Sequence, residues 1–156
     1  MTKVDRLWVL GQWTLLAGFI LVLILISPSH DPQLPAWFGI ILCVLSPIIV
    51  AFAVRSHRAI NHSVRVRIGP SPNTEMRLVD CGIYAHVRHP MYLAAILLLL
   101  GAAIWRGSLV ALGYVVLAVV FVYLKARYEE RLLLLTYPEY SDYMLRTGRL
   151  LPWIGK

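Results

Sequence analysis

A chain of 156 residues that is 59% hydrophobic and only 15% charged is too apolar for an ordinary soluble domain, and its mean hydropathy of +0.70 agrees. In a soluble chain, the net charge of +7 would suggest a nucleic-acid-binding protein. The long apolar runs argue against that class and indicate an integral membrane protein whose partner is the lipid bilayer, with no nucleic acid and no evident protein partner.

Four apolar segments are predicted to cross the membrane as helices, at about residues 7–26, 35–54, 90–105 and 108–126. The first two are about as long as the roughly 20 residues that a helix needs to cross the bilayer core. The third would be only about 24 Å long, so it is expected to begin slightly inside the cytoplasmic leaflet. The expected fold is all-α, a polytopic bundle of four transmembrane helices in a single domain, residues 1–156.

The basic residues are distributed unevenly between the two ends of these spans. Of the 15 Lys and Arg residues, Arg106 alone lies on the short turns of one side. By the positive-inside rule, this distribution places both termini in the cytoplasm. The same basic face is expected to attract anionic lipid head groups.

Two cytoplasmic segments hold most of the polar residues. The connection, residues 55–89, contains the strand-like run VRVRI (64–68) and the breaker GPSPN (69–73). The tail, residues 127–156, is expected to begin as a continuation of the fourth helix and to close a site from below. Cys43 and Cys81 lie in different environments, so no disulfide is expected. No Cys-x-x-Cys pattern occurs, and no metal site is expected.

Arg88, His89 and Pro90 stand where the third apolar helix must begin. Proline fits the first turn, because an N–H group there has no partner within the helix. Arg88 and His89 are then expected beside free N–H donors at the positive end of the helix dipole, an arrangement that binds an anion. Two alternatives stay open from this stretch: both side chains could anchor the helix to lipid phosphates, or His86 and His89 could ligate a metal.

Glu129 and Glu130 follow the fourth span, close to a leaflet whose anionic lipids would repel them. Pairing with basic residues of the same helix explains one glutamate better than two. Because a tight turn, residues 105–108, joins the third and fourth helices, the two glutamates are expected to face Arg88 and His89 at one depth. A zwitterion such as an amino acid would fit between them.

Two stretches carry a family resemblance: LVDCGIYAHVRHPMYLAAILLLLG (78–101) and YEERLLLLTYPEYSDYMLRTGRLLP (128–152). The ordered set of motifs, with a helical hairpin between them, resembles the isoprenylcysteine carboxyl methyltransferase and phospholipid N-methyltransferase superfamily over about residues 40–154. The motif residues in place are Gly82, Tyr84, Arg88, His89, Pro90, Met91, Tyr92, Glu129, Glu130, Tyr140, Tyr143, Arg149 and Pro152.

The resemblance implies an integral membrane methyltransferase that transfers a methyl group from S-adenosyl-L-methionine to a membrane-embedded or amphiphilic acceptor and releases S-adenosyl-L-homocysteine. It implies cofactor-binding roles for Tyr84, His86, Arg88, His89, Pro90, Tyr92, Leu93, Glu129 and Glu130. It implies catalytic roles for Arg149, His89 and Arg88, with Arg146 as a second candidate for closing the site.

The connection resembles that of the small bacterial members, which implies the bacterial inner membrane and leaves the acceptor open. A phospholipid or small-molecule N- or S-methyltransferase is therefore an alternative to the prenylcysteine type. Arg-His-Pro-x-Tyr also recurs in sterol reductases that bind NADPH, although the Tyr-Glu-Glu of this tail departs from their pattern. A membrane scaffold without catalytic activity is the third alternative.

Overall fold

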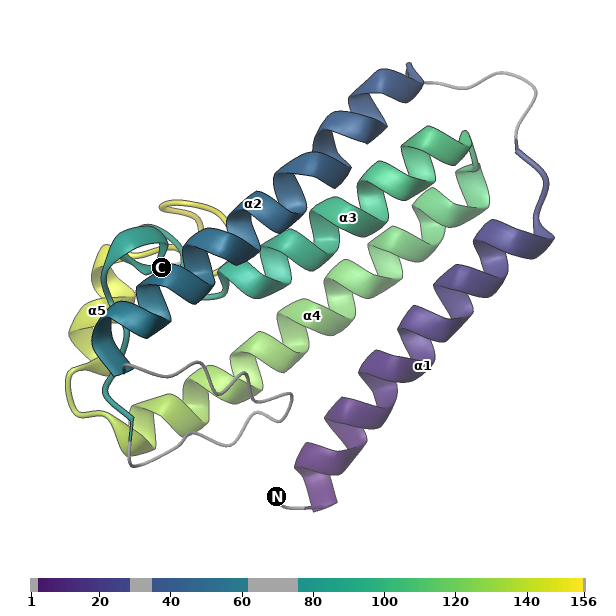
Figure 1. The fold of residues 1–156 in the computed structure, drawn as a ribbon. Helices are drawn as coiled ribbons and strands as arrows, with labels where there is room; N and C mark the ends of the chain where they lie inside the picture. Colours follow the sequence, from purple (N-terminus) through teal and green to yellow (C-terminus); the bar gives the residue numbers. More distant parts are fainter. Residues whose placement is uncertain (1–2, 29–34, 62–75, 156) are drawn as a thin grey trace.

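The computed structural model describes residues 3–28, 35–61 and 76–155. The elements in chain order are α1 (Lys3–Leu25), α2 (Ala36–Asn61), the short 3-10 helix η1 (Gly82–Ala85), α3 (Pro90–Arg106), α4 (Leu109–Thr136) and α5 (Tyr140–Arg146). Figure 1 shows successive long helices running in opposite directions, with η1, α5 and the C-terminal segment gathered at one end of the bundle. The predicted all-α fold is confirmed for the described residues.

Among the described residues, three helices are long and apolar enough to cross a membrane: α1, α2 and α4, with 23, 26 and 28 residues. Helix α3 is apolar as well but has only 17 residues, a length of about 26 Å, which is less than the roughly 30 Å of the hydrocarbon core. The described helices thus support three predicted spans by length and show the short third helix that the sequence indicated. A crossing by α3 stays a prediction.

Helix α4 continues ten residues beyond the predicted end of the fourth span at residue 126 and ends at Thr136. The expectation that the tail begins as a continuation of this helix is therefore confirmed. As a result, both glutamates of the tail stand on a rigid helix instead of on a loop.

The turn between α3 and α4 is tight because its two caps are well formed. Gly107 ends α3 in the left-handed conformation, with φ of 65°, which glycine adopts without steric cost. Ser108 then caps α4, where its side chain accepts a hydrogen bond from the Ala111 N–H at 3.2 Å. The two helices form an antiparallel hairpin, which brings the C-terminal half of α4 beside the start of α3.

Two glycines let α2 and α3 approach closely. A Cβ on Gly39 would lie 2.5 Å from the carbonyl oxygen of Gly101, and a Cβ on Gly101 would lie 2.6 Å from that of Gly39. Both distances are too short for any larger residue, so the backbones touch at this point, as in the small-residue contacts of membrane helices. This contact was not predictable from the sequence, because each glycine is isolated in its own segment.

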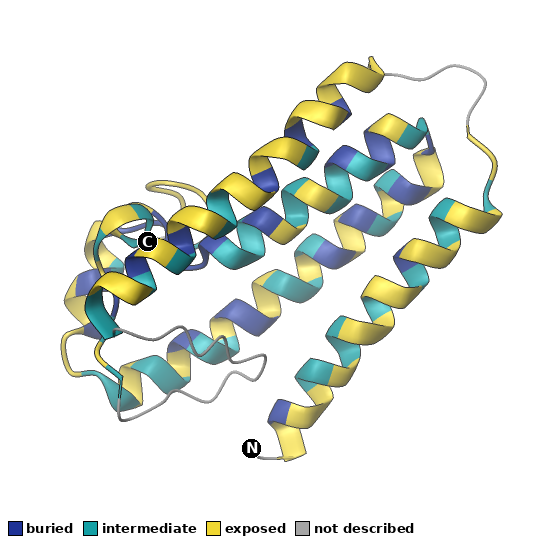
Figure 2. Ribbon diagram, viewed as in Figure 1, coloured by how far each residue is buried: buried dark blue, intermediate teal, exposed yellow. Residues whose placement is uncertain are grey.

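Many residues of the long helices are exposed in the isolated chain (Figure 2). Large apolar residues are common among them, which is the pattern expected for helices that face lipid. The buried apolar core between α1, α3 and α4 is small and consists of Phe19, Ala103, Ala111 and Val115. Helix α1 packs mainly on α4, for example where the rings of Trp8 and Phe121 meet edge to face at 5.3 Å.

The strand-like run VRVRI and the breaker GPSPN lie outside the described residues. Among the described residues, the only extended pairings are two isolated bridges, Val87 with Gly148 and Leu151 with Ile154. The first bridge joins the segment before α3 to the tail. Both ends of the described chain, together with this junction, lie at the same end of the bundle (Figure 1).

Candidate active site

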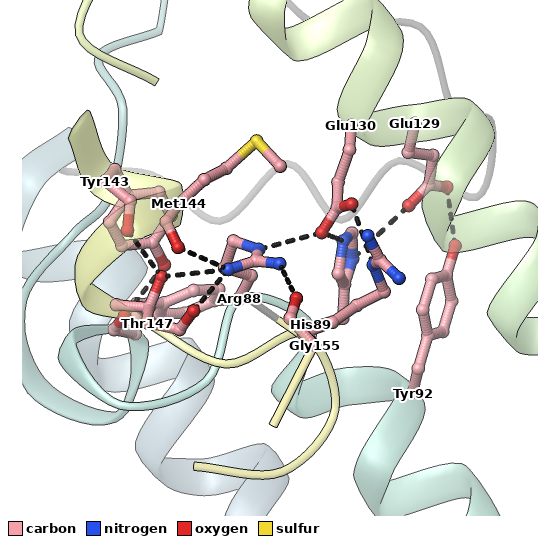
Figure 3. Close-up of polar contacts among 11 residues, drawn as sticks. Arg88, His89, Tyr92, Glu129, Glu130, Tyr143, Met144, Thr147 and Gly155 are labelled. Atoms are coloured by element: carbon pink, nitrogen blue, oxygen red, sulfur yellow. Dashed lines mark hydrogen bonds and ion pairs between the residues drawn. The ribbon is translucent and has the colours of Figure 1, made fainter. Parts of the chain in front are cut away.

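The Arg88 guanidinium is the centre of a buried polar cluster before α3. Its Nε donates to Glu130 Oε1 of α4 at 2.8 Å. Its Nη1 donates to the carbonyl groups of Met144, at 3.0 Å, and Thr147. Its Nη2 donates to the Gly155 carbonyl at 2.7 Å (Figure 3). Arg88 therefore connects α4 to the C-terminal segment, and four of its five N–H donors serve the protein itself.

Glu130 lies between two guanidinium groups. While one carboxylate oxygen accepts from Arg88, the other accepts from Arg149 Nε at 2.8 Å. The Arg149 guanidinium carbon also lies 5.0 Å from the ring centroid of Tyr123. The prediction that the acidic and basic segments face each other is confirmed, and the alternative that Glu130 pairs only with residues of its own helix is wrong.

Glu129, His89 and Tyr92 form the second half of the cluster. The Tyr92 hydroxyl donates to Glu129 Oε1 at 2.5 Å, and its ring stacks on that of His89 with centroids 5.4 Å apart. His89 Nδ1 lies 3.6 Å from Glu129 Oε2, and Nε2 lies 3.5 Å from Glu130 Oε1. In Figure 3 both carboxylates reach from α4 toward side chains at the start of α3. One imidazole thus faces two carboxylates.

Lys125 and Gln12 extend this cluster toward α1. The Lys125 ammonium lies 5.2 Å from the ring centroid of Tyr92 and donates to Gln12 Oε1 at 2.5 Å. Lys125 is buried, although long charged side chains rarely are. From the sequence, the basic residues of this helix were expected only to pair with the glutamates on its surface, and nothing singled out Gln12. Lys125 and Gln12 are polar residues in predicted apolar spans, where such side chains are costly, and this placement could have marked both as functional candidates.

Backbone hydrogen bonds hold the tail against the start of α3. The Arg88 N–H donates to the Gly148 carbonyl at 2.9 Å, and the His89 N–H donates to the Arg149 carbonyl at 3.1 Å. In return, the Gly148 N–H donates to the His86 carbonyl at 3.1 Å. This short parallel pairing fixes the position of Arg149 next to Glu130.

Tyr84 and Tyr143 join η1 to α5 on the other side of Arg88. The Tyr143 hydroxyl donates to the Tyr84 carbonyl at 2.7 Å. Burial raises the pKa of the Tyr84 phenol to about 12 and also raises the pKa of Tyr143. Both phenols are therefore neutral at physiological pH, and Tyr143 keeps the proton that it donates.

Of the remaining predicted site residues, two lie at the start of α3 and two lie at the surface. Pro90 is buried as the first residue of α3, and Leu93 is half-buried one turn further along. His86 is exposed. Arg146 is also exposed, and its Nη2 lies 3.8 Å from Asp80 Oδ2, so it points to the surface and does not join Arg149.

One expectation about the start of α3 is wrong in part. The N–H groups of Tyr92 and Leu93 both donate to the His89 carbonyl at 3.1 Å. They are the usual first bonds of a helix and are not free for an anion. The polar character of the site comes from its side chains rather than from these two donors. Among the described residues, no three His, Cys, Asp or Glu side chains gather as a metal site.

Comparisons with known proteins agree with this geometry. The family model of phospholipid methyltransferases matches residues 34–140. The cobalt-zinc-cadmium resistance protein CzcN of Cupriavidus metallidurans is 30% identical over 146 residues, which cover 92% of this chain and 63% of CzcN. The structure of the eukaryotic intramembrane Ras methyltransferase ICMT, isoprenylcysteine carboxyl methyltransferase, matches with a TM-score of 0.62 and 21% identity, covering 99% of this chain and 55% of that one.

The chain therefore belongs to the phospholipid methyltransferase family, and the superfamily resemblance seen in its motifs is confirmed. The likeness to ICMT, at 21% identity, is a likeness of fold. The chain spans about 63% of the length of the curated relative that it matches. Helix α1 and Arg149 lie outside the residues that the family model matches.

Proposed function

We propose that this protein is an integral membrane methyltransferase that uses S-adenosyl-L-methionine and methylates an amphiphilic acceptor at the edge of the bilayer. The observation that supports the proposal most is the buried cluster in which Glu130 receives both Arg88 and Arg149 while Glu129 receives Tyr92. In this chain, the cluster is the place where charged side chains from the segment before α3, from α4 and from the tail meet.

The chemistry of these side chains fits the cofactor. S-Adenosyl-L-methionine carries an α-amino group, a carboxylate and a sulfonium cation. The cluster offers the carboxylates of Glu129 and Glu130 and the guanidinium of Arg149. In the part of the chain that the structure describes, His89 Nε2 is buried without a hydrogen bond, and its nearest charged neighbour is Glu130 Oε1 at 3.5 Å. A buried polar atom in this state is able to bind a polar group of the cofactor.

Each residue has a distinct task in this proposal. The cofactor supplies a methyl group on a positively charged sulfur, so the transfer needs alignment more than covalent help. Glu129 and Glu130 would bind the α-amino group, and Arg149 would close the site from the tail. The stacked rings of His89 and Tyr92 present aromatic faces, which stabilise a nearby cation. Arg88, whose donors are mostly used within the protein, would position Glu130.

The acceptor decides whether the site must move a proton. A carboxylate or thiolate acceptor needs no base. An amine acceptor must lose a proton, and His89 Nε2 is the buried nitrogen that would accept it. The proposal therefore covers prenylcysteine-like acids and phospholipid or small-molecule amines and thiols as acceptors.

The placement of the site suits a reaction between a water-soluble and a lipid-soluble substrate. The cluster lies at the end of the bundle where the tail and both ends of the described chain lie (Figure 1). By the positive-inside rule, we propose that this end faces the cytoplasm of a bacterial inner membrane. The cofactor would enter from the cytoplasm, and the acceptor would enter sideways from the lipid.

Calorimetry with S-adenosyl-L-homocysteine on the protein in lipid nanodiscs tests the proposal. We expect binding, and we expect Arg149→Ala to weaken it by about 10- to 100-fold, which corresponds to one lost charged hydrogen bond of about 1.5–3 kcal/mol. Arg146→Ala is the matched control, because its guanidinium faces the exposed Asp80, and its affinity should stay within about twofold.

Labelled-methyl transfer to fractionated membrane lipids then identifies the acceptor, and mass spectrometry of the product shows whether oxygen, nitrogen or sulfur was methylated. NADPH is titrated against the same sample. Binding of NADPH without binding of S-adenosyl-L-homocysteine would refute the methyltransferase proposal, and so would equal affinities of the two arginine variants.

A further inference from the structure

The C-terminal turn, residues 150–155, exposes three large apolar side chains. Leu151, Trp153 and Ile154 are 47%, 71% and 64% exposed in the isolated chain. Burying these side chains away from water is favourable, and a cluster of exposed apolar residues generally marks an interaction surface. The depth of this turn relative to the hydrocarbon core of the bilayer indicates which partner covers these side chains.

The predicted crossing of the bilayer by α3 gives that depth. Trp105 is exposed in the last turn of α3 on the far side, and tryptophan is typical of a membrane interface. The start of α3, about 26 Å away, therefore lies at or just inside the near edge of a hydrocarbon core of roughly 30 Å. Because the backbone of Arg88 and His89 is bonded to that of Gly148 and Arg149, the C-terminal turn lies at this edge too.

The turn is held in shape by the cluster. The Arg149 N–H donates to the Ile154 carbonyl at 3.0 Å, and Arg88 Nη2 donates to the Gly155 carbonyl at 2.7 Å. Trp153 has φ of 61°, which a bulky residue rarely adopts and which persists only where neighbours impose it. The strained backbone presents the indole ring outward instead of folding it onto the bundle.

We propose that the C-terminal turn inserts Leu151, Trp153 and Ile154 into the interface of the bilayer, so that the lipid itself holds Arg149 against Glu130. The partner is a lipid surface, since tryptophan favours this depth. The membrane then holds the tail in place over the start of α3. That this helps to retain the cofactor rests on the function proposed above, whereas the insertion itself does not.

Nitroxide labels in nanodiscs of phosphatidylethanolamine and phosphatidylglycerol test the insertion. Trp153→Cys is labelled in full-length protein that also carries Cys43→Ala and Cys81→Ala. Val116→Cys, exposed near the middle of the predicted fourth span, is the lipid reference. Leu135→Cys is the water reference, because it is exposed near the end of α4, about ten residues beyond the level of Tyr92 and Lys125.

We expect the ratio of relaxation enhancement by oxygen to that by a water-soluble nickel chelate to be clearly higher at 153 than at the Leu135 reference, and to lie between the Leu135 and Val116 values, as for a side chain at the interface. Enhancement like that at Leu135 would place the turn in water and overturn the proposal. Protection from both reagents would also overturn it, because it would show a protein partner or a second copy on this surface.

If Trp153→Cys does not fold, labels at Ile154→Cys and Leu151→Cys apply the same criterion. The label depth is read without cofactor, so its outcome is separate from the binding of S-adenosyl-L-homocysteine measured on unlabelled protein.

Discussion

Glu130→Gln tests whether the two guanidinium groups depend on one carboxylate. The Arg88 side chain is 0% exposed and that of Glu130 is 3% exposed, so this ion pair is almost fully removed from water. Removing one partner of a buried pair costs about 3–5 kcal/mol, because the other charge stays buried without compensation. Glutamine keeps one carbonyl acceptor at this position, so we expect a loss near the lower limit, about 3 kcal/mol in the free energy of unfolding.

The assay is equilibrium unfolding in mixed micelles with increasing sodium dodecyl sulfate, followed by circular dichroism. Glu139→Gln is the matched control, since Glu139 is exposed just before α5, and it should change the free energy of unfolding by less than about 0.5 kcal/mol. Arg149→Met, alone and combined with Glu130→Gln, completes a double-mutant cycle whose coupling energy should reach at least about 1 kcal/mol. A loss below about 1 kcal/mol for Glu130→Gln would refute the view that the carboxylate compensates buried charge.

Two further substitutions probe other contacts with the same unfolding assay. Gly101→Ala should destabilise the protein by about 1–3 kcal/mol, since its Cβ would lie 2.6 Å from the Gly39 carbonyl oxygen. Gly113→Ala is the control, because its Cβ would lie in open space, and it should be neutral or slightly stabilising. Equal effects at the two sites would contradict a backbone contact between α2 and α3. Tyr92→Phe removes the hydroxyl that donates a hydrogen bond to Glu129, so we expect the free energy of unfolding to fall by about 1.5–3 kcal/mol. An unchanged value would show that this bond contributes nothing to stability.

The sequence predicts the helices well because the signals that define them are local. Apolar runs, Pro90 at the start of a helix and the Gly107–Ser108 turn need no knowledge of distant residues. The juxtaposition of Glu130 with Arg88 follows from the same information, since a tight antiparallel turn leaves the two segments side by side.

Backbone partners and distant pairings were not predictable in this way. Carbonyl groups of Met144, Thr147 and Gly155 accept from Arg88, and every residue has a carbonyl, so no residue type marks them. The contact of Gln12 with Lys125 joins helices whose relative rotation the sequence does not define. For the same reason Arg146 and Arg149, three positions apart, could not be assigned to opposite sides of the tail.

The touching glycines of α2 and α3 determine which parts of the bundle are able to move. With the Gly39 and Gly101 backbones in direct contact, these two helices cannot slide or close further, and a ligand cannot pass between them at that level. We expect α2 and α3 to move together as one unit. An opening that admits a substrate or releases a product is therefore expected at other contacts, such as that of α1 with α4 or that of the tail with the start of α3.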